Sequence, residues 1–231
     1  MAAFDPAQAG AVLAACAIVS FLICGIPFGL IFGELMGHRD IRRSGSGNIG
    51  TTNALRVAGP KVAAATLALD VLKGVLCVNA ARWALSSLGF HAGAAAVAPG
   101  GPGDWMLSLV CFACVAGHVF SPYLHFKGGK GIACGVGVLL GWCWPLALLH
   151  LAIFIVLVAI TRYVSVGSIV TAALVPVTVT LAFPFSSIWM RAIMALLGLM
   201  VVWAHRSNIR KLMAGKESKL SFSKRADGPD R

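Results

Sequence analysis

Residues 11–32 read AVLAACAIVSFLICGIPFGLIF, an apolar run without a charged side chain. A helix rises about 1.5 Å per residue, so a run of this length can cross the roughly 30 Å hydrocarbon core of a bilayer. The preceding Met1 to Gly10 contains no Lys or Arg, whereas a secretory signal would carry positive charge there. We therefore predict that this stretch stays in the protein as a transmembrane helix.

The composition of the whole chain extends this prediction. Of its 231 residues, 58% are apolar and 12% are charged, whereas soluble domains have about 25% charged residues. We predict an all-α, polytopic membrane protein with one domain over residues 1–231 and a disordered basic tail at 221–231. Seven transmembrane helices, some of them short, are predicted at 8–33, 60–88, 104–120, 131–146, 147–161, 165–183 and 187–205.

The positive charges fall mainly on one side of this arrangement. Of the 19 Lys and Arg residues, Arg82 and Arg191 lie on one side and Lys73 lies inside a helix. Because basic loops stay in the cytoplasm, we predict an outside N-terminus and a cytoplasmic C-terminus. The predicted cytoplasmic residues are Arg39, Arg42, Arg43, Arg56, Lys61, Lys127, Lys130, Arg162, Arg206, Arg210, Lys211, Lys216, Lys219, Lys224, Arg225 and Arg231.

The segment 37–59, GHRDIRRSGSGNIGTTNALRVAG, is rich in small hydrogen-bonding residues between two predicted spans. Glycine allows positive φ, so successive main-chain N–H groups can converge on one anion, and a helix that begins near Thr51 would point its positive end there. Ser, Thr and Asn add neutral donors, and Arg adds bidentate charge. We predict an anion site, with an ordinary solvated loop as the alternative. The candidate residues are Arg43, Gly45, Ser46, Gly47, Asn48, Thr51, Asn53 and Arg56.

The segment 117–131, GHVFSPYLHFKGGKG, places a double glycine between two lysines. Glycines let the main chain approach a ligand, and lysines act as point charges for phosphate. His118 is the first polar residue after the apolar helix, so we expect it at the membrane surface, with a helix-end cap as the alternative to a role in the site. The candidate ligands are Lys127, Gly128, Gly129 and Lys130.

The segment 203–217, WAHRSNIRKLMAGKE, continues the last apolar helix into polar residues. His205 and Asn208 are three residues apart and would share one face of that helix. A polybasic tail that touches anionic lipid is the alternative, and it accounts for Lys211 onward.

Asp70 and Lys73 lie three residues apart inside a predicted span. Ionisable groups in a membrane are expensive unless they are paired or line a polar cavity. We predict an internal ion pair with a structural role before a catalytic one.

All seven cysteines lie in or beside apolar stretches. Cys111 and Cys114 have CxxC spacing, but no second pair accompanies them, so we expect buried, small apolar side chains without a metal or redox role. The connector 89–103, GFHAGAAAVAPGGPG, is expected to be flexible and without chemistry.

Several familiar sites are absent from the sequence. There is no GxxxxGK[ST] phosphate loop, HExxH motif, Ser-His-Asp pattern or HxxxxD acyltransferase box. We therefore predict no metal and no cofactor. The formal charge of +11 is explained by topology and by anionic lipid or substrate, not by nucleic acid. An acyl transfer from an activated donor is compatible with the absence of these motifs, because positioning of the substrates and stabilisation of charge can provide the catalysis.

Five blocks resemble the bacterial acyl-phosphate:glycerol-3-phosphate acyltransferases of the PlsY type, over about residues 12–220. Cys24 stands where the family's first motif has glycine. The blocks are GIPFG at 25–29, DIRRSGSGNIGTTNALR at 40–56, DVLKG at 70–74, GHVFSPYLHFKGGKGIA at 117–133 and HRSNIRKLMAGKES at 205–218.

The resemblance implies a seven-helix enzyme of the bacterial inner membrane with its active site on the cytoplasmic side. It would move a fatty acyl group from acyl phosphate to the 1-hydroxyl of glycerol 3-phosphate, giving 1-acylglycerol 3-phosphate and phosphate. Ser46 and Asn48 would hold the acyl phosphate, and Arg56 and Lys130 would be the main cations. The glycerol 3-phosphate pocket would be shaped by His205, Asn208 and Ser168.

Two other functions remain as alternatives at this point. A transporter of an organic phosphate or another anion would need polar residues strung across the membrane, whereas the helices after residue 131 are almost free of ionisable groups at mid-depth. A lipid-binding scaffold would need only the basic tail, which leaves the glycine-bracketed loops unexplained.

Overall fold

The structure is a computed structural model that describes residues 5–37 and 39–220. The predicted disordered tail, 221–231, lies outside these residues. Within them the regular elements are helical, which confirms the all-α prediction. The helices are α1 (Pro6–Gly25), α2 (Phe28–Leu35), α3 (Thr51–Ala58), α4 (Pro60–Ala84), α5 (Asp104–Val119), α6 (Ile132–Trp142), α7 (Trp144–Thr161), α8 (Val164–Ala182), α9 (Ile188–Ala204) and α10 (Arg206–Met213). Short helical turns occur at Ile41–Arg43, Leu85–Gly89, Ala94–Val97 and Pro122–Leu124.

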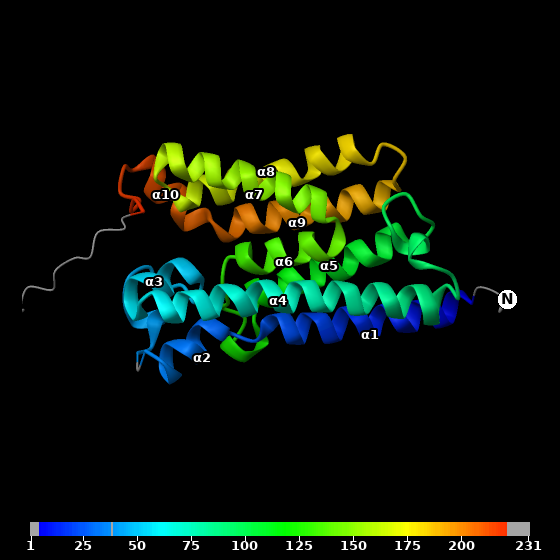
Figure 1. Cartoon of the computed structure of the whole chain (residues 1–231), viewed down its shortest axis with the longest axis horizontal. Helices are drawn as coiled ribbons and strands as arrows, with labels where there is room; N and C mark the ends of the chain where they lie inside the picture. The colour runs from blue at the N-terminus through cyan, green and yellow to red at the C-terminus, as the bar shows by residue number, and fades with distance from the viewer. Residues whose placement is uncertain (1–4, 38, 221–231) are drawn as a thin grey trace, which may run out of the picture.

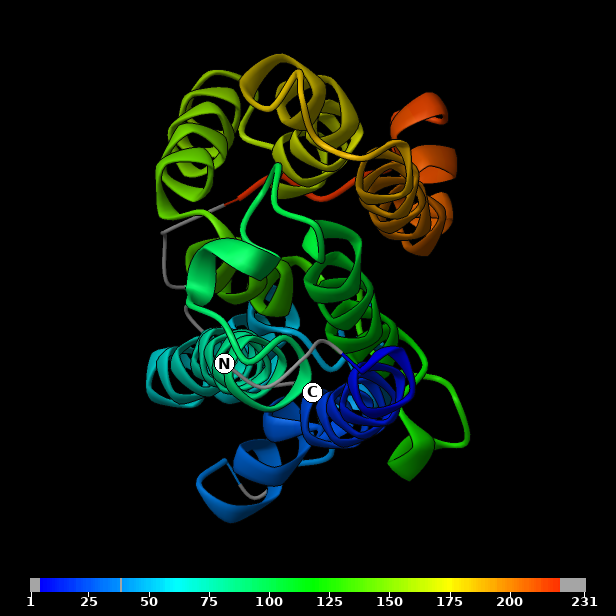
Figure 2. The same ribbon diagram turned by 90° about the vertical axis from the view of Figure 1, so that its right-hand side faces the viewer.

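The long helices run along one axis, and the short ones gather at one end (Figure 1). There α2, α3 and α10 lie together, while α1 begins at the opposite end. In the end-on view, α7, α8 and α9 form one group, and α1, α4, α5 and α6 form the other (Figure 2). Contacts between α5 and α9 and between α6 and α7 join the two groups.

The lengths of the helices limit how many of them cross a membrane. Five helical segments are long and apolar enough, and a sixth is added if α9 and α10 count as one bent span. α6 has 11 residues, about 17 Å, which is too short to cross alone. The multi-pass prediction is thus confirmed, while seven crossings and the sides of the termini remain predictions. The five segments are Pro6–Leu35, Pro60–Gly89, Asp104–Leu124, Trp144–Thr161 and Val164–Ala182.

Glycines form the closest helix crossings. Gly117 of α5 lies against the backbone of Phe21 in α1, and Gly137 of α6 lies against the backbone of Val71 in α4. A Cβ atom at Gly74 would come within 2.6 Å of the Cys134 carbonyl oxygen. Small residues let helix backbones approach in this way, and these crossings set the positions of the loops that follow.

The structure corrects three details of the prediction. The connector 89–103 contains a 3-10 helix with Val97 buried, so it is built against the bundle instead of being featureless. α7 begins at Trp144 and not at 147, because Pro145 suits the first turn of a helix. The last apolar helix does not run straight into the polar segment: α9 ends at Ala204, and α10 departs at 55°.

Candidate active site

The three predicted loop segments meet at one cavity of about 560 Å³. Its lining includes residues of α3 and α10, which lie at one end of the bundle (Figure 1), and residues of α6, α7 and α8. The structure therefore brings together segments that are up to 170 residues apart. The predicted site residues that line the cavity are Ser46, Asn48, Thr51, Asn53, Arg56, Lys130, Ser168, His205 and Asn208.

The glycine-rich loop wraps around the beginning of α3. Gly45 and Gly47 have φ of +65° and +69°, a conformation that favours glycine. α3 begins at Thr51, as predicted, so its positive N-terminus points toward the loop. The two glycines do not line the cavity themselves. They shape the turn that carries Ser46 to it.

Asn53 fixes this loop from inside. Its side-chain oxygen accepts a hydrogen bond from the Ser46 N–H at 2.8 Å, and its amide donates to the carbonyl oxygens of Ile41 at 2.7 Å and Ser44 at 3.3 Å. The residue is only 2% exposed. Its hydrogen-bonding groups are thus engaged by the loop, which gives Asn53 a positioning role. Its predicted contact with substrate remains a prediction.

The double glycine anchors the second loop onto α5. The N–H of Gly128 donates to the Val119 carbonyl, and the N–H of Gly129 donates to the His118 carbonyl, each at 3.0 Å. The glycines do not line the cavity, and a Cβ atom on either one would collide with α5. They are required for the close approach that places Lys130 in the cavity wall.

Two predicted cations point away from the cavity. The side chain of Arg43 is 86% exposed, and its Nε lies 3.6 Å from the Asp40 carboxylate. Arg42 makes the closer pair with Asp40, at 2.8 Å, and holds the pKa of that carboxyl down to about 2. Lys127 is exposed in the loop before the double glycine. Their contact with substrate remains a prediction.

Lys130 is the half-buried cation of the site. Burial lowers the pKa of its ammonium below the ordinary value. The nearby charge of Glu217 raises it, whereas Lys211 and Arg56 lower it further. An anionic ligand at this position would favour the charged form of Lys130.

The predicted ion pair inside α4 is present, and its Asp70 lines the cavity. Lys73 Nζ lies 2.7 Å from Asp70 Oδ1, and it also donates to the Ile26 carbonyl at 2.9 Å. His118 Nδ1 lies 3.1 Å from the same ammonium. Because Lys can only donate, we assign Nδ1 as the acceptor and Nε2 as the protonated nitrogen of a neutral imidazole. His118 is 4% exposed, so its ring is enclosed by the helix bundle. Its position at the level of the membrane surface remains a prediction.

His205 and Asn208 reach the cavity from either side of the bend between α9 and α10. His205 Nδ1 lies 2.8 Å from the Val201 carbonyl, which must accept, so Nε2 of the neutral ring is left as an acceptor. Asn208 Nδ2 donates to Glu217 Oε1 at 2.7 Å. Glu217 also lines the cavity, in the segment that follows α10.

Several buried polar atoms at the cavity lack a partner within the protein. Among the residues that the structure describes, six buried side-chain nitrogen or oxygen atoms have no hydrogen bond, and four of them belong to lining residues. Such atoms are unfavourable unless a ligand or water satisfies them. They are Thr51 Oγ1, Asp70 Oδ1, Ser165 Oγ and Asn208 Oδ1, of which Asp70 Oδ1 is already in the Lys73 ion pair.

The inner part of the cavity is mainly apolar, with His150 of α7 and Thr171 of α8 as polar side chains in its wall. α6 begins just after Lys130, and Leu139 lies nine residues further along the chain, roughly 14 Å deeper. The wall there is completed by Ala147 and Phe154 of α7 and by Val175 of α8. A polar mouth therefore leads into a groove that suits a hydrocarbon chain.

The whole chain was compared with known families. A sequence profile described as Glycerol-3-phosphate acyltransferase matches residues 14–215. The chain belongs to this acyltransferase family. A relative named glycerol-3-phosphate acyltransferase from Agrobacterium fabrum is 40% identical over 218 residues, which cover 94% of this chain and 96% of the relative. The namesake from Bartonella henselae is 37% identical over 203 residues, which cover 88% and 89%.

Solved structures support the same assignment. The chain superposes on the crystal structure of PlsY, an integral membrane glycerol 3-phosphate acyltransferase, in its glycerol 3-phosphate form with a TM-score of 0.76. The two are 28% identical, and 90% of this chain and 96% of the other are covered. The lysophosphatidic acid form of PlsY superposes with a TM-score of 0.74 at 28% identity, covering 90% and 95%.

The acyltransferase site also contains residues that the sequence reasoning did not assign to it. Glu217 belongs to the block 205–218, whose similarity could have indicated it. Asp70 and His118 were noted as polar residues in or beside a span, and both line the cavity. Ser165 lies three residues before Ser168 on the inner face of α8, and nothing in the sequence distinguishes it from an ordinary buried serine.

Proposed function

We propose that this acyltransferase moves a fatty acyl group from acyl phosphate to the 1-hydroxyl of glycerol 3-phosphate. The products are 1-acylglycerol 3-phosphate and inorganic phosphate, and the reaction is the first acylation of bacterial phospholipid synthesis. One observation carries the proposal: a single cavity joins a mouth lined by Arg56 and Lys130 to an apolar groove along α6 to α8. A donor with an anionic head and a long chain matches both parts.

The reaction requires the protein mainly to position the two substrates and to stabilise negative charge. The 1-hydroxyl attacks the carbonyl carbon of the acyl phosphate, and negative charge develops on the carbonyl oxygen. Phosphate leaves with the electrons of the broken C–O bond and takes up the proton of the attacking hydroxyl, so the products are the ester and hydrogen phosphate. Arg56 and Lys130 would stabilise the phosphate charge before and during its departure. Ser46 and Asn48, beside the N-terminus of α3, would hold the same group with neutral donors. Because acyl phosphate is already activated, no protein nucleophile is needed.

The acceptor would lie on the side of α8 and α10. His205 offers the lone pair of Nε2 to a substrate hydroxyl, and Asn208 keeps Oδ1 free for another. Ser168 completes this side of the cavity, although its hydroxyl also donates to the Val164 carbonyl at 2.9 Å. These groups would orient glycerol 3-phosphate so that one hydroxyl faces the acyl carbon.

We extend the proposal to the membrane arrangement. Seven helical segments would lie in the bacterial inner membrane, of which α6 covers only part of the bilayer thickness, with the N-terminus outside and the cavity mouth at the cytoplasmic face. The basic loops at that end of the bundle support this orientation. The acyl chain would then enter the groove from the lipid while the phosphate head remains at the mouth.

The names of the relatives support glycerol 3-phosphate as the acyl acceptor, but they do not name the acyl donor. The curated relatives carry glycerol 3-phosphate in their name, and PlsY was crystallised in glycerol 3-phosphate and lysophosphatidic acid forms. The assignment of acyl phosphate rests on the resemblance of the loop motifs.

A donor comparison tests the proposal. Purified protein in lipid nanodiscs is incubated with glycerol 3-phosphate and with palmitoyl phosphate, palmitoyl-CoA or palmitoyl-acyl-carrier protein, and lysophosphatidic acid is measured by mass spectrometry. We expect stoichiometric phosphate and product from palmitoyl phosphate alone. Product from the thioesters at an equal rate would refute the donor. Uptake of glycerol 3-phosphate into sealed vesicles without product would instead indicate a transporter.

A further inference from the structure

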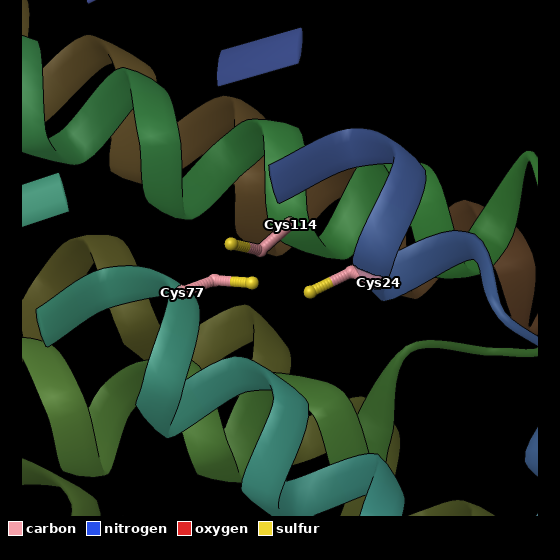
Figure 3. Close-up of side chains that lie close together, drawn as sticks. All are labelled: Cys24, Cys77 and Cys114. Carbon is pink, nitrogen blue, oxygen red and sulfur yellow. The ribbon is translucent and has the colours of Figure 1, made fainter. Parts of the chain in front are cut away.

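Three thiols from three helices meet inside the bundle. Cys24 of α1, Cys77 of α4 and Cys114 of α5 are at most 6% exposed, and their sulfur atoms all lie within 4.8 Å of one another (Figure 3). Figure 3 shows the three side chains pointing into one space. Over residues 5–37 and 39–220, this is the one group of three His, Cys, Asp or Glu side chains arranged closely enough to hold a metal ion.

A fourth thiol completes the group. Cys134, in the first turn of α6, is fully buried, and its sulfur lies 3.7 Å from the Cys114 carbonyl oxygen. Its side chain also interacts with the Cys24 thiol. We call Cys24, Cys77, Cys114 and Cys134 the thiol cluster. Its four sulfur atoms come from four different helices, so no local sequence motif indicates the cluster.

The thiol cluster lies beside the ion pair that Asp70 and Lys73 form in α4. Cys77 follows Lys73 by one helical turn, and Cys114 precedes His118 by one turn. Cys24 stands two residues before Ile26, whose carbonyl accepts a hydrogen bond from the same lysine. The cluster therefore lies one helical turn beyond the Lys73–His118 contact, away from the mouth.

We propose that the thiol cluster is a binding site for a thiophilic divalent cation of the Zn²⁺ class. Zn–S bonds are about 2.3 Å long, which places sulfurs in a tetrahedral site about 3.8 Å apart. The sulfurs of Cys24, Cys77 and Cys114 would have to move by less than about 1 Å to reach that spacing. Each of the three metal–thiolate bonds replaces an S–H bond, and the three protons leave to water.

Charge favours a divalent ion over a monovalent one. Three thiolates with Zn²⁺ carry one negative charge, whereas three thiolates with Cu⁺ carry two. A dry interior penalises net charge strongly, so the divalent complex is the less costly one. The fourth sulfur then serves best as a neutral thiol donor, since a fourth thiolate would add another charge. Thiolate ligands exclude hard cations such as Mg²⁺ and Ca²⁺.

A hollow of about 290 Å³ lies beside the cluster. Cys77 borders it, and Ile23 of α1, Phe28 of α2 and Lys73 of α4 also line it. The exposed side chains of Leu72 and Leu76 surround it. One thiol of the cluster therefore borders open space.

A metal titration tests the proposal on the full chain. Protein purified in detergent with a chelator and a reductant is exchanged into chelator-free buffer and titrated with Cd²⁺, whose thiolate complexes absorb in the ultraviolet by charge transfer. We expect one Cd²⁺ per chain, the charge-transfer band, and a melting temperature that rises with Cd²⁺ concentration because the ion binds the native state. Cys77→Ala and Cys114→Ala should lose all three effects.

Cys111→Ala is the matched control, since Cys111 is also buried in α5 but stands outside the thiol cluster. It should bind Cd²⁺ like the wild type. If the cluster variants prove unstable, X-ray absorption of the Zn²⁺-loaded wild type gives an independent answer: three or four sulfur neighbours at about 2.3 Å are expected. Binding that survives the Cys77→Ala/Cys114→Ala double variant, a shell of nitrogen and oxygen, or no stoichiometric binding would overturn the proposal.

Discussion

The side-chain oxygen of Asn53 accepts a hydrogen bond from the main-chain N–H of Ser46 at 2.8 Å. A residue in the first turn of α3 thus holds the tip of the loop that precedes the helix. The same side chain donates to the Ile41 and Ser44 carbonyls, so three loop groups depend on it. The loop that carries Ser46, the predicted anion site, is therefore held in shape by the protein itself.

Removing this side chain should loosen the loop. Asn53→Ala leaves one N–H and two carbonyls without their partner, and each buried group left unsatisfied costs about 1–3 kcal/mol. We expect a lower melting temperature and at least a tenfold loss of acyl transfer, measured with saturating glycerol 3-phosphate and varied palmitoyl phosphate. Asn79→Ala is the control, because Asn79 is exposed on α4 and bonds only within that helix and to Arg82. An Asn53 variant with wild-type kinetics would contradict the positioning role.

The lowered pKa of Lys130 predicts how the apparent affinity for substrate changes at alkaline pH. Its pKa is lowered by burial, so the ammonium loses its charge at a lower pH than an exposed lysine does. Both substrate phosphates are already ionised in that range, since their second pKa is about 6. The apparent affinity for substrate should therefore be present below the lowered pKa and disappear as pH rises through it.

The variant Lys130→Arg separates this cause from others, because arginine stays protonated throughout. We expect its substrate affinity to remain flat at alkaline pH, even if the rate is reduced at all pH values. Lys130→Ala and Arg56→Ala should lose most activity while the protein still inserts in the membrane. If Lys130→Arg keeps the alkaline decline of the wild type, another group is responsible.

Local sequence was enough to predict the two glycine loops. The Gly-Gly pair before Lys130 and the glycines around Ser46 act through backbone geometry, which depends on neighbouring residues in the chain. The local sequence was therefore sufficient to predict that they form turns. The N–H groups of Gly128 and Gly129 bond to α5, so they are not free to bind a ligand. The predicted contact of these glycines with substrate remains a prediction.

Features that depend on contacts between residues far apart in the sequence could not be predicted from the local sequence. The 55° bend at His205 arises where the end of α9 packs against other helices, and no proline or glycine marks it. The partner of Asn208 is Glu217, nine residues away across that bend. The CxxC spacing drew attention to Cys111, yet Cys114 meets Cys24 and Cys77, whose sequence positions are unrelated to it.

The ion pair of Asp70 and Lys73 should make single and double variants differ. Lys73→Met leaves a carboxylate alone in the interior, which costs about 3–5 kcal/mol. Asp70→Asn in the same chain removes that charge, so thermal unfolding of the double variant should return toward the wild-type temperature. The measurement is a double-mutant cycle in one detergent. Additive losses from the two changes would show that the pair is not coupled.

Glu217 should act on the acceptor through Asn208. Its carboxylate accepts from Asn208 Nδ2 at 2.7 Å and so turns Oδ1 toward the cavity. Glu217→Ala should raise the KM for glycerol 3-phosphate roughly tenfold and change the KM for palmitoyl phosphate less, whereas Glu217→Gln should keep most of the activity because it still offers an acceptor. Equal effects on both substrates would place Glu217 elsewhere in the mechanism.

The apolar end of the cavity should set the length of the acyl chain. Ala147 is 3% exposed and lines the wall in the first turn of α7, which follows the end of α6 that lies away from Lys130. Ala147→Leu adds three carbons to that wall and shortens the space for a chain, since a packed core yields little. We expect kcat/KM to fall for palmitoyl phosphate and to fall much less for a decanoyl donor, measured by product formation in nanodiscs. Ala68→Leu is the control, because Ala68 is exposed on α4 and lines neither cavity. A uniform loss with all donors would mean that the leucine disturbs packing without meeting the chain, and the acyl groove would then have to lie elsewhere.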